Sequence, residues 1–101
     1  MKYIIENGFL VSAKVEEKEV NGRKLKFGKL MVREAIYDEE KCMASDTLHF
    51  LDCPADKVEI VKDFTNSKVK VEGILRVNEI NKEGKTLRYY RFICDSIDKI
   101  D

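Results

Sequence analysis

Basic side chains are concentrated in two segments of the sequence, where they are suited to contacting a chain of phosphates. Between Asn21 and Arg33 there are five basic residues and no acidic one: Arg23, Lys24, Lys26, Lys29 and Arg33. Between Asn81 and Arg91, the basic residues Lys82, Lys85, Arg88 and Arg91 accompany a single acid, Glu83. Lysine and arginine neutralise the phosphates of nucleic acids. A solvated strand face has the same composition, so both interpretations stay open at this point.

Three tyrosines lie in or beside these basic segments. Tyr37 follows the first segment, whereas Tyr89 and Tyr90 lie inside the second. Nucleic-acid bases stack on exposed aromatic rings, although aromatic side chains also pack in protein cores. Because Tyr89 and Tyr90 are adjacent, a strand directs them to opposite faces. We therefore expect one of them in the core and the other exposed beside Arg88 or Arg91.

His49 and Phe50 are adjacent as well, and they divide between two faces in the same way. For the phenylalanines, core packing is the expected role. The predicted nucleic-acid-binding residues are Arg23, Lys24, Lys26, Lys29, Arg33, Tyr37, Arg76, Lys85, Arg88, Tyr89, Tyr90 and Arg91. Binding through such residues weakens as salt rises, because phosphate contacts release counter-ions.

The overall composition limits the class of protein. The 101 residues predict a single domain, 1–101, and their 44% apolar and 38% charged content is typical of a globular chain. The 19 basic and 19 acidic residues cancel, so net charge gives no argument for nucleic acid. No apolar run approaches the about 18 residues of a membrane span, and the opening MKYIIENGFL is no secretory signal. We expect a cytoplasmic protein with no membrane partner.

Residues that carry catalysis or bind metals show no informative spacing. His49 is the one histidine, and no ligand pattern surrounds it. Cys42, Cys53 and Cys94 are an odd number without a CxxC pair, which favours reduced core or surface thiols. The sequence contains no phosphate-binding loop and no nucleophile-elbow motif. We expect no enzyme activity, no cofactor and no metal.

The first half of the chain predicts strands. Apolar residues alternate from Phe9 to Val15, and Asn21-Gly22 is a strong hairpin signal. The returning strand, 24–36, changes its apolar parity after Gly28, which predicts a bulge there. The polar segment 35–47 is expected to be a loop, and 47–52 a short third strand.

The second half begins with a change of period. Pro54 suits a first helical turn, and apolar residues at helical spacing predict a helix from Pro54 to about residue 65. Asn66 is suited to a left-handed cap. Strands at 68–77 and 87–97 follow, joined by a hairpin around Glu83-Gly84. This order predicts a small closed five-stranded barrel, all-β with one short helix between the third and fourth strands, which is an OB-fold. Gly28 and Gly73 then mark corners at which strands bend.

The amino-acid sequence resembles bacterial-type single-stranded DNA-binding proteins over nearly the whole chain. NGFLVSAKVE is similar to the family's opening strand, and NGRKLKFGKLMVREA to its hairpin and coiled second strand. The most distinctive piece is DFTNSKVKVEGILRV, in which Val69, Val71, Glu72, Gly73 and Leu75 match the family pattern, while Asn66 replaces its usual turn glycine. NKEGKTLRYYRFICDSI resembles the family's fifth strand and the hairpin before it.

This resemblance implies sequence-tolerant binding of single-stranded DNA, or RNA, without catalysis, in replication, recombination or repair. It also implies a homo-oligomer, either dimer or tetramer, and other replication proteins as partners. The chain departs from the family at Thr47, Cys53 and Ile80, where stacking aromatics are usual, and it lacks an acidic tail. In being tail-less it resembles primosomal replication protein B. The alternative is an OB-fold that serves as a protein-interaction or assembly module without significant nucleic-acid binding.

Overall fold

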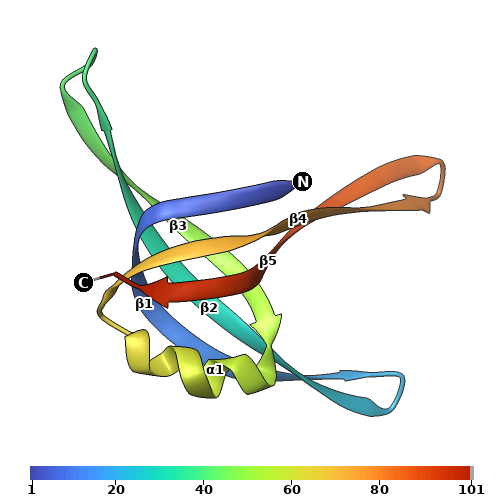
Figure 1. Ribbon diagram of the computed structural model, residues 1–101. Helices are drawn as coiled ribbons and strands as arrows, with labels where there is room; N and C mark the ends of the chain where they lie inside the picture. Colours follow the sequence, from blue (N-terminus) through green and yellow to red (C-terminus); the bar gives the residue numbers. More distant parts are fainter. Residues whose placement is uncertain (101) are drawn as a thin grey trace.

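Alternating side chains and tight turns organise the chain into five long strands and one short helical segment (Figure 1). The computed structural model describes residues 1–100. The elements are β1 (Lys2–Val20), β2 (Arg23–Asp38), β3 (Met43–Pro54), α1 (Ala55–Val61), the 3-10 turn η1 (Lys62–Phe64), β4 (Lys68–Lys82) and β5 (Lys85–Lys99). The strands close into a barrel in the order β1-β2-β3-β5-β4. The predicted fold class, a closed five-stranded OB-fold barrel with one helix between β3 and β4, is confirmed.

The barrel interior is filled by the apolar side chains that alternate along the strands. Its fully buried members are Leu10, Leu30, Val32, Leu51, Val69 and Val71. Val58 and Val61 of α1 are buried in the same core, so the helix covers one end of the barrel. Pro54 occupies the N-cap position, one residue before the first helical turn in which the sequence predicts it, and the helical segment ends at Phe64. Asn66 has a φ of 67°, so its predicted left-handed conformation is confirmed.

Two hairpins turn through pairs of residues that accept positive φ. Asn21 and Gly22 have φ values of 51° and 78°, and Glu83 and Gly84 have values of 53° and 74°. Positive φ at both central residues matches the type I′ turn, whose twist suits the flanking strands. Both predicted hairpins are therefore confirmed.

The predicted loop at 35–47 is wrong, because most of it forms a third hairpin. β2 continues to Asp38 and pairs with β3 from Asp38↔Met43 onward, so the turn occupies only residues 39–42. The hairpin projects past the barrel, as Figure 1 shows in green at the upper left. Its strands face solvent on both sides and need no apolar alternation, which hid them from the sequence pattern.

The predicted bulge at Gly28 is also wrong. The β1–β2 ladder runs through Gly28 without a break and shifts between Leu10 and Ser12, so the extra residue is Val11 of β1. Gly28 instead makes room for the helix: a Cβ atom there would lie 2.6 Å from Sγ of Cys53 and would also crowd Val58. A bulge bends the strand that contains it, so this one bends β1 and leaves no mark in the β2 sequence.

Gly73 lies in the middle of β4 because two other groups approach its backbone. The β4–β5 register shifts beside it, leaving Asp95 of β5 as the extra residue, so a β-bulge lies next to the position at which the sequence predicts a corner. The Tyr3 hydroxyl passes over Gly73 and donates a hydrogen bond to the Ile93 carbonyl at 3.0 Å. A Cβ atom on Gly73 would overlap both that hydroxyl and that carbonyl oxygen. Gly73 therefore permits the contact that ties β1 to β5.

We predict that Gly73→Ala lowers the free energy of unfolding by about 1–3 kcal/mol, because the added methyl group overpacks against backbone. The matched control is Glu72→Ala in the same strand. It removes a half-exposed carboxylate paired with Lys70 and should change stability by less than about 0.5 kcal/mol. Urea denaturation of both variants measures the difference. Equal stability of Gly73→Ala and the unsubstituted protein would contradict the close approach described here.

Candidate nucleic-acid interface

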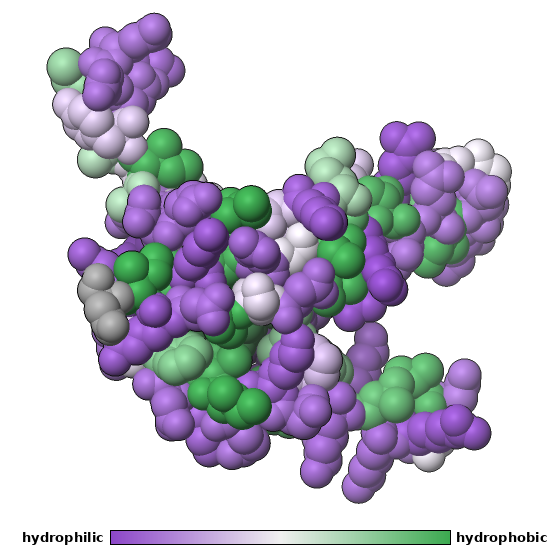
Figure 2. Space-filling model, viewed as in Figure 1, coloured by the Kyte–Doolittle hydropathy of each residue, from purple (hydrophilic) through white to green (hydrophobic). Residues whose placement is uncertain are grey.

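Two of the three projecting hairpins flank the outer face of the barrel beside β2 and β3. The β1–β2 hairpin and the β4–β5 hairpin extend to the same side of the molecule, and Figure 2 shows a hollow between them. The groove in this hollow is lined by Lys18, Leu25, Lys26, Phe27, Lys29, Asp52 and Arg91. These residues come from β1, β2, β3 and β5, so closure of the barrel assembles the groove from distant parts of the sequence.

Phe50 is the most exposed aromatic side chain next to this groove. It pairs across the β2–β3 ladder with Met31, two residues along from the Lys29↔Asp52 pair, and 62% of it is exposed. The expectation that Phe50 packs in the core is wrong. Its neighbour Leu51 takes the core position, so strand alternation directs Phe50 outward. Assigning Leu51 to the core face and Phe50 to the outer face would have identified this residue from the sequence.

Asp52 holds two cations together at the floor of the groove. Lys29 Nζ donates a hydrogen bond to one carboxylate oxygen of Asp52, and Arg91 Nε donates to the other at 2.9 Å. The Asp52 side chain is 13% exposed. Burial alone would raise its pKa, but the hydrogen bonds and charges of Lys29 and Arg91 outweigh burial and lower the pKa below the ordinary value. Asp52 is therefore ionised at neutral pH and links β2, β3 and β5.

Strand alternation divides the predicted binding residues into two sets. The first set shares the outward parity of Phe50, Asp52 and their partners: Arg23, Lys29, Arg33, Tyr37, Arg76, Lys85, Tyr89 and Arg91. The second set has the opposite parity: Lys24, Lys26, Arg88 and Tyr90. Of this second set, Lys26 still lines the groove. The structure thus brings Lys26, Lys29 and Arg91 together and directs Arg88 and Tyr90 to the other face of the β4–β5 hairpin.

Both tyrosines of β5 are exposed, so the expectation that one lies in the core is wrong. Tyr89 is 51% exposed and Tyr90 is 60% exposed. They pair with Asn78 and Val77 in a two-stranded part of the hairpin, beyond the buried barrel core. A two-stranded ribbon has no interior, and both faces meet solvent. Tyr37, near the tip of the β2–β3 hairpin, is 62% exposed for the same reason.

The basic residues also differ in their ion pairs. Lys26 pairs with Glu17, Arg88 with Glu79, and Lys29 and Arg91 share Asp52. Within residues 1–100, no ion pair forms at Arg23, Lys24, Arg33, Arg76 or Lys85. Arg33 instead lies over the ring of Phe9, with the guanidinium carbon 5.1 Å from the ring centroid. These charges remain available to an anionic ligand.

Comparison with known proteins identifies the architecture. No protein-family model matches the sequence, and no curated protein matches it. A single-stranded DNA-binding protein from Thermus aquaticus, in a deletion variant, aligns over 99% of this chain and 50% of its own, with 17% identity and a TM-score of 0.58. This chain therefore spans half the length of that protein. The chain has the OB-fold of single-stranded DNA-binding proteins.

Two further solved structures share this OB-fold over nearly their full length. A small single-stranded DNA-binding protein from Streptomyces coelicolor aligns over 99% of this chain and 94% of its own, with 14% identity and a TM-score of 0.52. A Plasmodium falciparum protein of the same kind, in complex with single-stranded DNA, aligns over 100% and 93%, with 14% identity and a TM-score of 0.55. At these identities the likeness establishes the fold.

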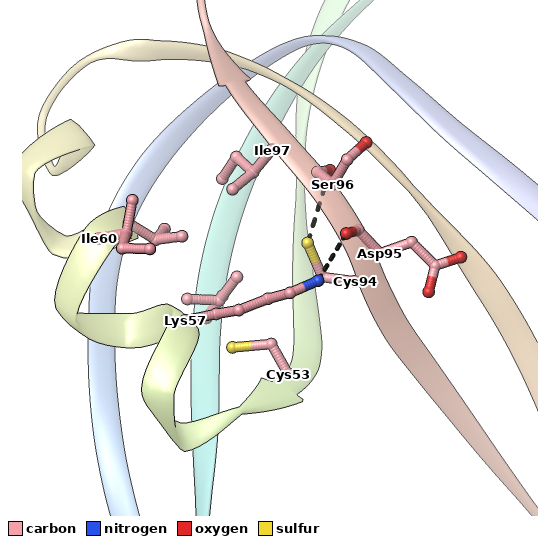
Figure 3. Close-up of a pocket in the computed structure, with 9 residues that line it drawn as sticks. Cys53, Lys57, Ile60, Cys94, Asp95, Ser96 and Ile97 are labelled. Atoms are coloured by element: carbon pink, nitrogen blue, oxygen red, sulfur yellow. Dashed lines mark hydrogen bonds between the residues drawn. The ribbon is translucent and has the colours of Figure 1, made fainter.

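A smaller pocket at the other end of the OB-fold differs in character from the groove. It lies beside α1 and contains Cys53, Lys57 and Cys94, with Ile60 and Ile97 among its apolar lining (Figure 3). Lys57 Nζ donates to the Asp95 carbonyl at 2.7 Å. Burial raises the pKa of the Cys94 thiol to about 11, which keeps it protonated and unreactive at neutral pH. Both pocket cysteines are free thiols.

Two classes of feature are missing from the part of the chain that the structure describes. No cluster of three or more His, Cys, Asp or Glu side chains in residues 1–100 is placed to hold a metal ion. None of its helices has the length and apolar character needed to cross a bilayer.

We predict that Asp52→Asn lowers stability at neutral pH by about 1 kcal/mol, because it weakens two charge-assisted hydrogen bonds. An aspartate with a depressed folded-state pKa stabilises the protein above its unfolded-state pKa and loses this contribution as pH falls through the folded-state value. The unsubstituted protein should therefore lose more stability on acidification than Asp52→Asn. Urea denaturation at neutral and acidic pH measures both.

Glu79→Gln is the control for this comparison, because Glu79 and its partner Arg88 are exposed and such surface pairs contribute little. Its acid dependence should match that of the unsubstituted protein. If Asp52→Asn shows that same dependence, the carboxylate does not hold its two cations as described.

Proposed function

We propose that this chain is a non-catalytic protein that binds single-stranded DNA with little sequence preference. One observation carries the proposal: the exposed Phe50 ring lies two residues along β3 from Asp52, in a hollow that shares Lys29 with the groove between the two projecting hairpins. In OB-folds, oligonucleotides bind on the face of strands 2 and 3, between the β1–β2 and β4–β5 loops. The groove of this chain occupies that place.

Binding in this groove would combine two interactions. Cations follow the sugar–phosphate backbone, and aromatic rings stack on bases without distinguishing them. Phe50 would provide the central stacking ring, with Tyr89 on the neighbouring hairpin. Arg23, Arg76 and Lys85, which form no ion pair within residues 1–100, would contact phosphates directly. Lys29 and Arg91 have further N–H donors beyond those that Asp52 accepts.

The proposed biological setting is replication, recombination or repair in the cytoplasm, with other replication proteins as partners. The single-stranded DNA-binding proteins of similar fold support single-stranded DNA as the ligand, and the Plasmodium falciparum structure contains it. Single-stranded RNA is the related ligand to compare. The stacking surface described above does not depend on a 2′-hydroxyl contact, which is the group that separates RNA from DNA.

We also propose a homo-oligomer, a dimer or tetramer, assembled through the start of β1. Residues 2–5 pair with β4 on one side, whereas pairing with β2 begins only at Gly8. The other edge of residues 2–7 is therefore open, and Ile4 is exposed there. Open edges of this kind pair with other strands, and a second copy of this chain offers an identical one.

The alternative function is a protein-interaction module. The net charge of zero favours it, as does the neutralisation of Lys29 and Arg91 by Asp52. Charge reversal at Lys24, Lys26 and Lys29 separates the two functions, since polyanion binding should collapse while a protein complex need not change. The collapse would be visible as loss of binding at every salt concentration.

We predict that an oligothymidine of about 30 bases binds and saturates its OB-fold site, which spans roughly 4–16 nucleotides. Fluorescence anisotropy of the labelled oligothymidine should show affinity falling as salt rises. Phe50→Ala should weaken binding by about tenfold or more, since stacking contributes about 1–3 kcal/mol per base. Ile60→Ala is the control, because Ile60 is an exposed residue of α1 at the other end of the barrel. Absence of binding at low salt would rule out the proposed function.

For the assembly, we predict that sedimentation equilibrium gives a mass of at least two chains. Ile4→Lys should shift the equilibrium toward monomers, because a charge on an open edge opposes strand pairing. Ile36→Lys, at an exposed apolar residue of the β2–β3 hairpin, is the control. A monomeric unsubstituted protein, or an equal effect of both substitutions, would contradict assembly through β1.

A further inference from the structure

A row of outward-facing residues crosses four strands next to the groove. Leu48 of β3 pairs with Arg33 of β2, Arg33 pairs with Phe9 of β1, and Phe9 pairs with Lys68 of β4. Direct cross-strand partners point to the same side of a sheet. Their neighbours Leu10, Val32 and Val69 are buried, so the row itself faces outward.

The row contains the groups that recognise a nucleotide. The Arg33 guanidinium lies over the half-buried Phe9 ring, and together they present a stacked aromatic and guanidinium surface of the kind that holds bases. An open hollow surrounds them, lined by Asn7, Gly8, Phe9, Arg33, Ala35, Asp46 and Lys68. Neither Arg33 nor Lys68 forms an ion pair with any residue of 1–100. The hollow therefore offers two cations against the single carboxylate of Asp46.

This row continues directly from the proposed binding face. Leu48 lies two residues from Phe50 on β3, and Arg33 lies two residues from Met31, the cross-strand partner of Phe50. From β3 to β4 the row spans three strand spacings, about 14 Å at ~4.8 Å each. A strand that stacks on Phe50 needs to advance only by this distance around the barrel to reach Lys68.

Packing of the core does not account for the presence of either cation, Lys68 or Arg33. Lys68 is exposed and pairs through its backbone with β1, so its ammonium group adds nothing to closure of the barrel. The Arg33–Phe9 contact is a cation–π interaction, which exposed side chains also form. It leaves the guanidinium without an anionic partner. An anionic, base-bearing ligand satisfies all three side chains together.

We propose that single-stranded DNA bound in the groove continues over this row, where Phe9 and Arg33 form a second base-stacking platform and Lys68 contacts the next phosphate. The proposal rests on the proposed function and extends its site beyond the two hairpins. Strands too short to pass Phe50 do not use the row. Longer strands gain affinity from it.

Two oligothymidines test this extension, one of about 6 bases and one of about 16, both within the range of OB-fold sites. Lys68→Ala should leave affinity for the short strand within about twofold, weaken binding of the long strand, and lower its salt slope by about 0.7 for the lost phosphate contact. Phe9→Leu should weaken only the long strand, by about tenfold. Lys62→Ala, at the helical end of the barrel, is the control for loss of one positive charge and should affect neither strand.

Because Lys68 is exposed, Lys68→Ala keeps the fold, and its thermal midpoint should equal that of the unsubstituted protein. Equal effects of Lys68→Ala on both strands, or no effect on either, would overturn the extension while leaving the groove intact. If the unsubstituted protein binds neither strand, the extension fails together with the proposed function.

Discussion

Closure of the barrel between β3 and β5 is the constraint on which the rest of this structure depends. These strands run parallel, and within residues 1–100 their ladder has a single registered pair, Asp52 with Ile93. Because this ladder is so short, side-chain hydrogen bonds are needed to hold the closure together. On the outer surface, Asp52 binds Lys29 and Arg91. The Tyr3 side chain packs against the core, and its hydroxyl donates to the Ile93 carbonyl at 3.0 Å. At the helical end, Lys57 donates to the Asp95 carbonyl at 2.7 Å. Three of these bonds join β5 to another element, and the Lys29–Asp52 bond joins β2 to β3.

The same closure creates the candidate site and sets its charge. Asp52 stabilises the junction of β2, β3 and β5, and in doing so it places a carboxylate between two cations at the floor of the groove. A bound phosphate would compete with Asp52 for Lys29 and Arg91, so the groove attracts anions less strongly than its count of basic residues indicates. The cations without such partners lie nearer the hairpins and along the row through Arg33 and Lys68. This distribution explains how a chain with no net charge can present a local surface for a polyanion.

Sequence patterns predicted the parts of the fold that depend on local chemistry or on burial. Asn21-Gly22 and Glu83-Gly84 require positive φ, and Pro54 and Asn66 bound the helical segment, so these elements were evident. The patterns failed where neither signal acts. The hairpin at 35–47 has no buried face, and the bulge of the β1–β2 ladder lies in β1 at Val11 instead of in β2 at Gly28. The prediction of the site failed for a related reason. The exposure of Phe50, Tyr89 and Tyr90 depends on where the barrel core ends, which local patterns do not show. The reason for Gly73 is a contact with Tyr3, which lies 70 positions away in the sequence and was beyond any local pattern.

The most direct test of the central claim is a map of backbone-amide chemical shifts in the ¹⁵N-labelled protein as oligothymidine is added. A strand held between the two hairpins should produce its largest changes in β2 around Lys29, in β3 around Phe50 and Asp52, and in β5 around Tyr89 and Arg91. Amides of α1, on the far end of the barrel, should change little. Changes confined to α1 or to the start of β1, or no changes at all, would contradict the assignment of this face to single-stranded DNA.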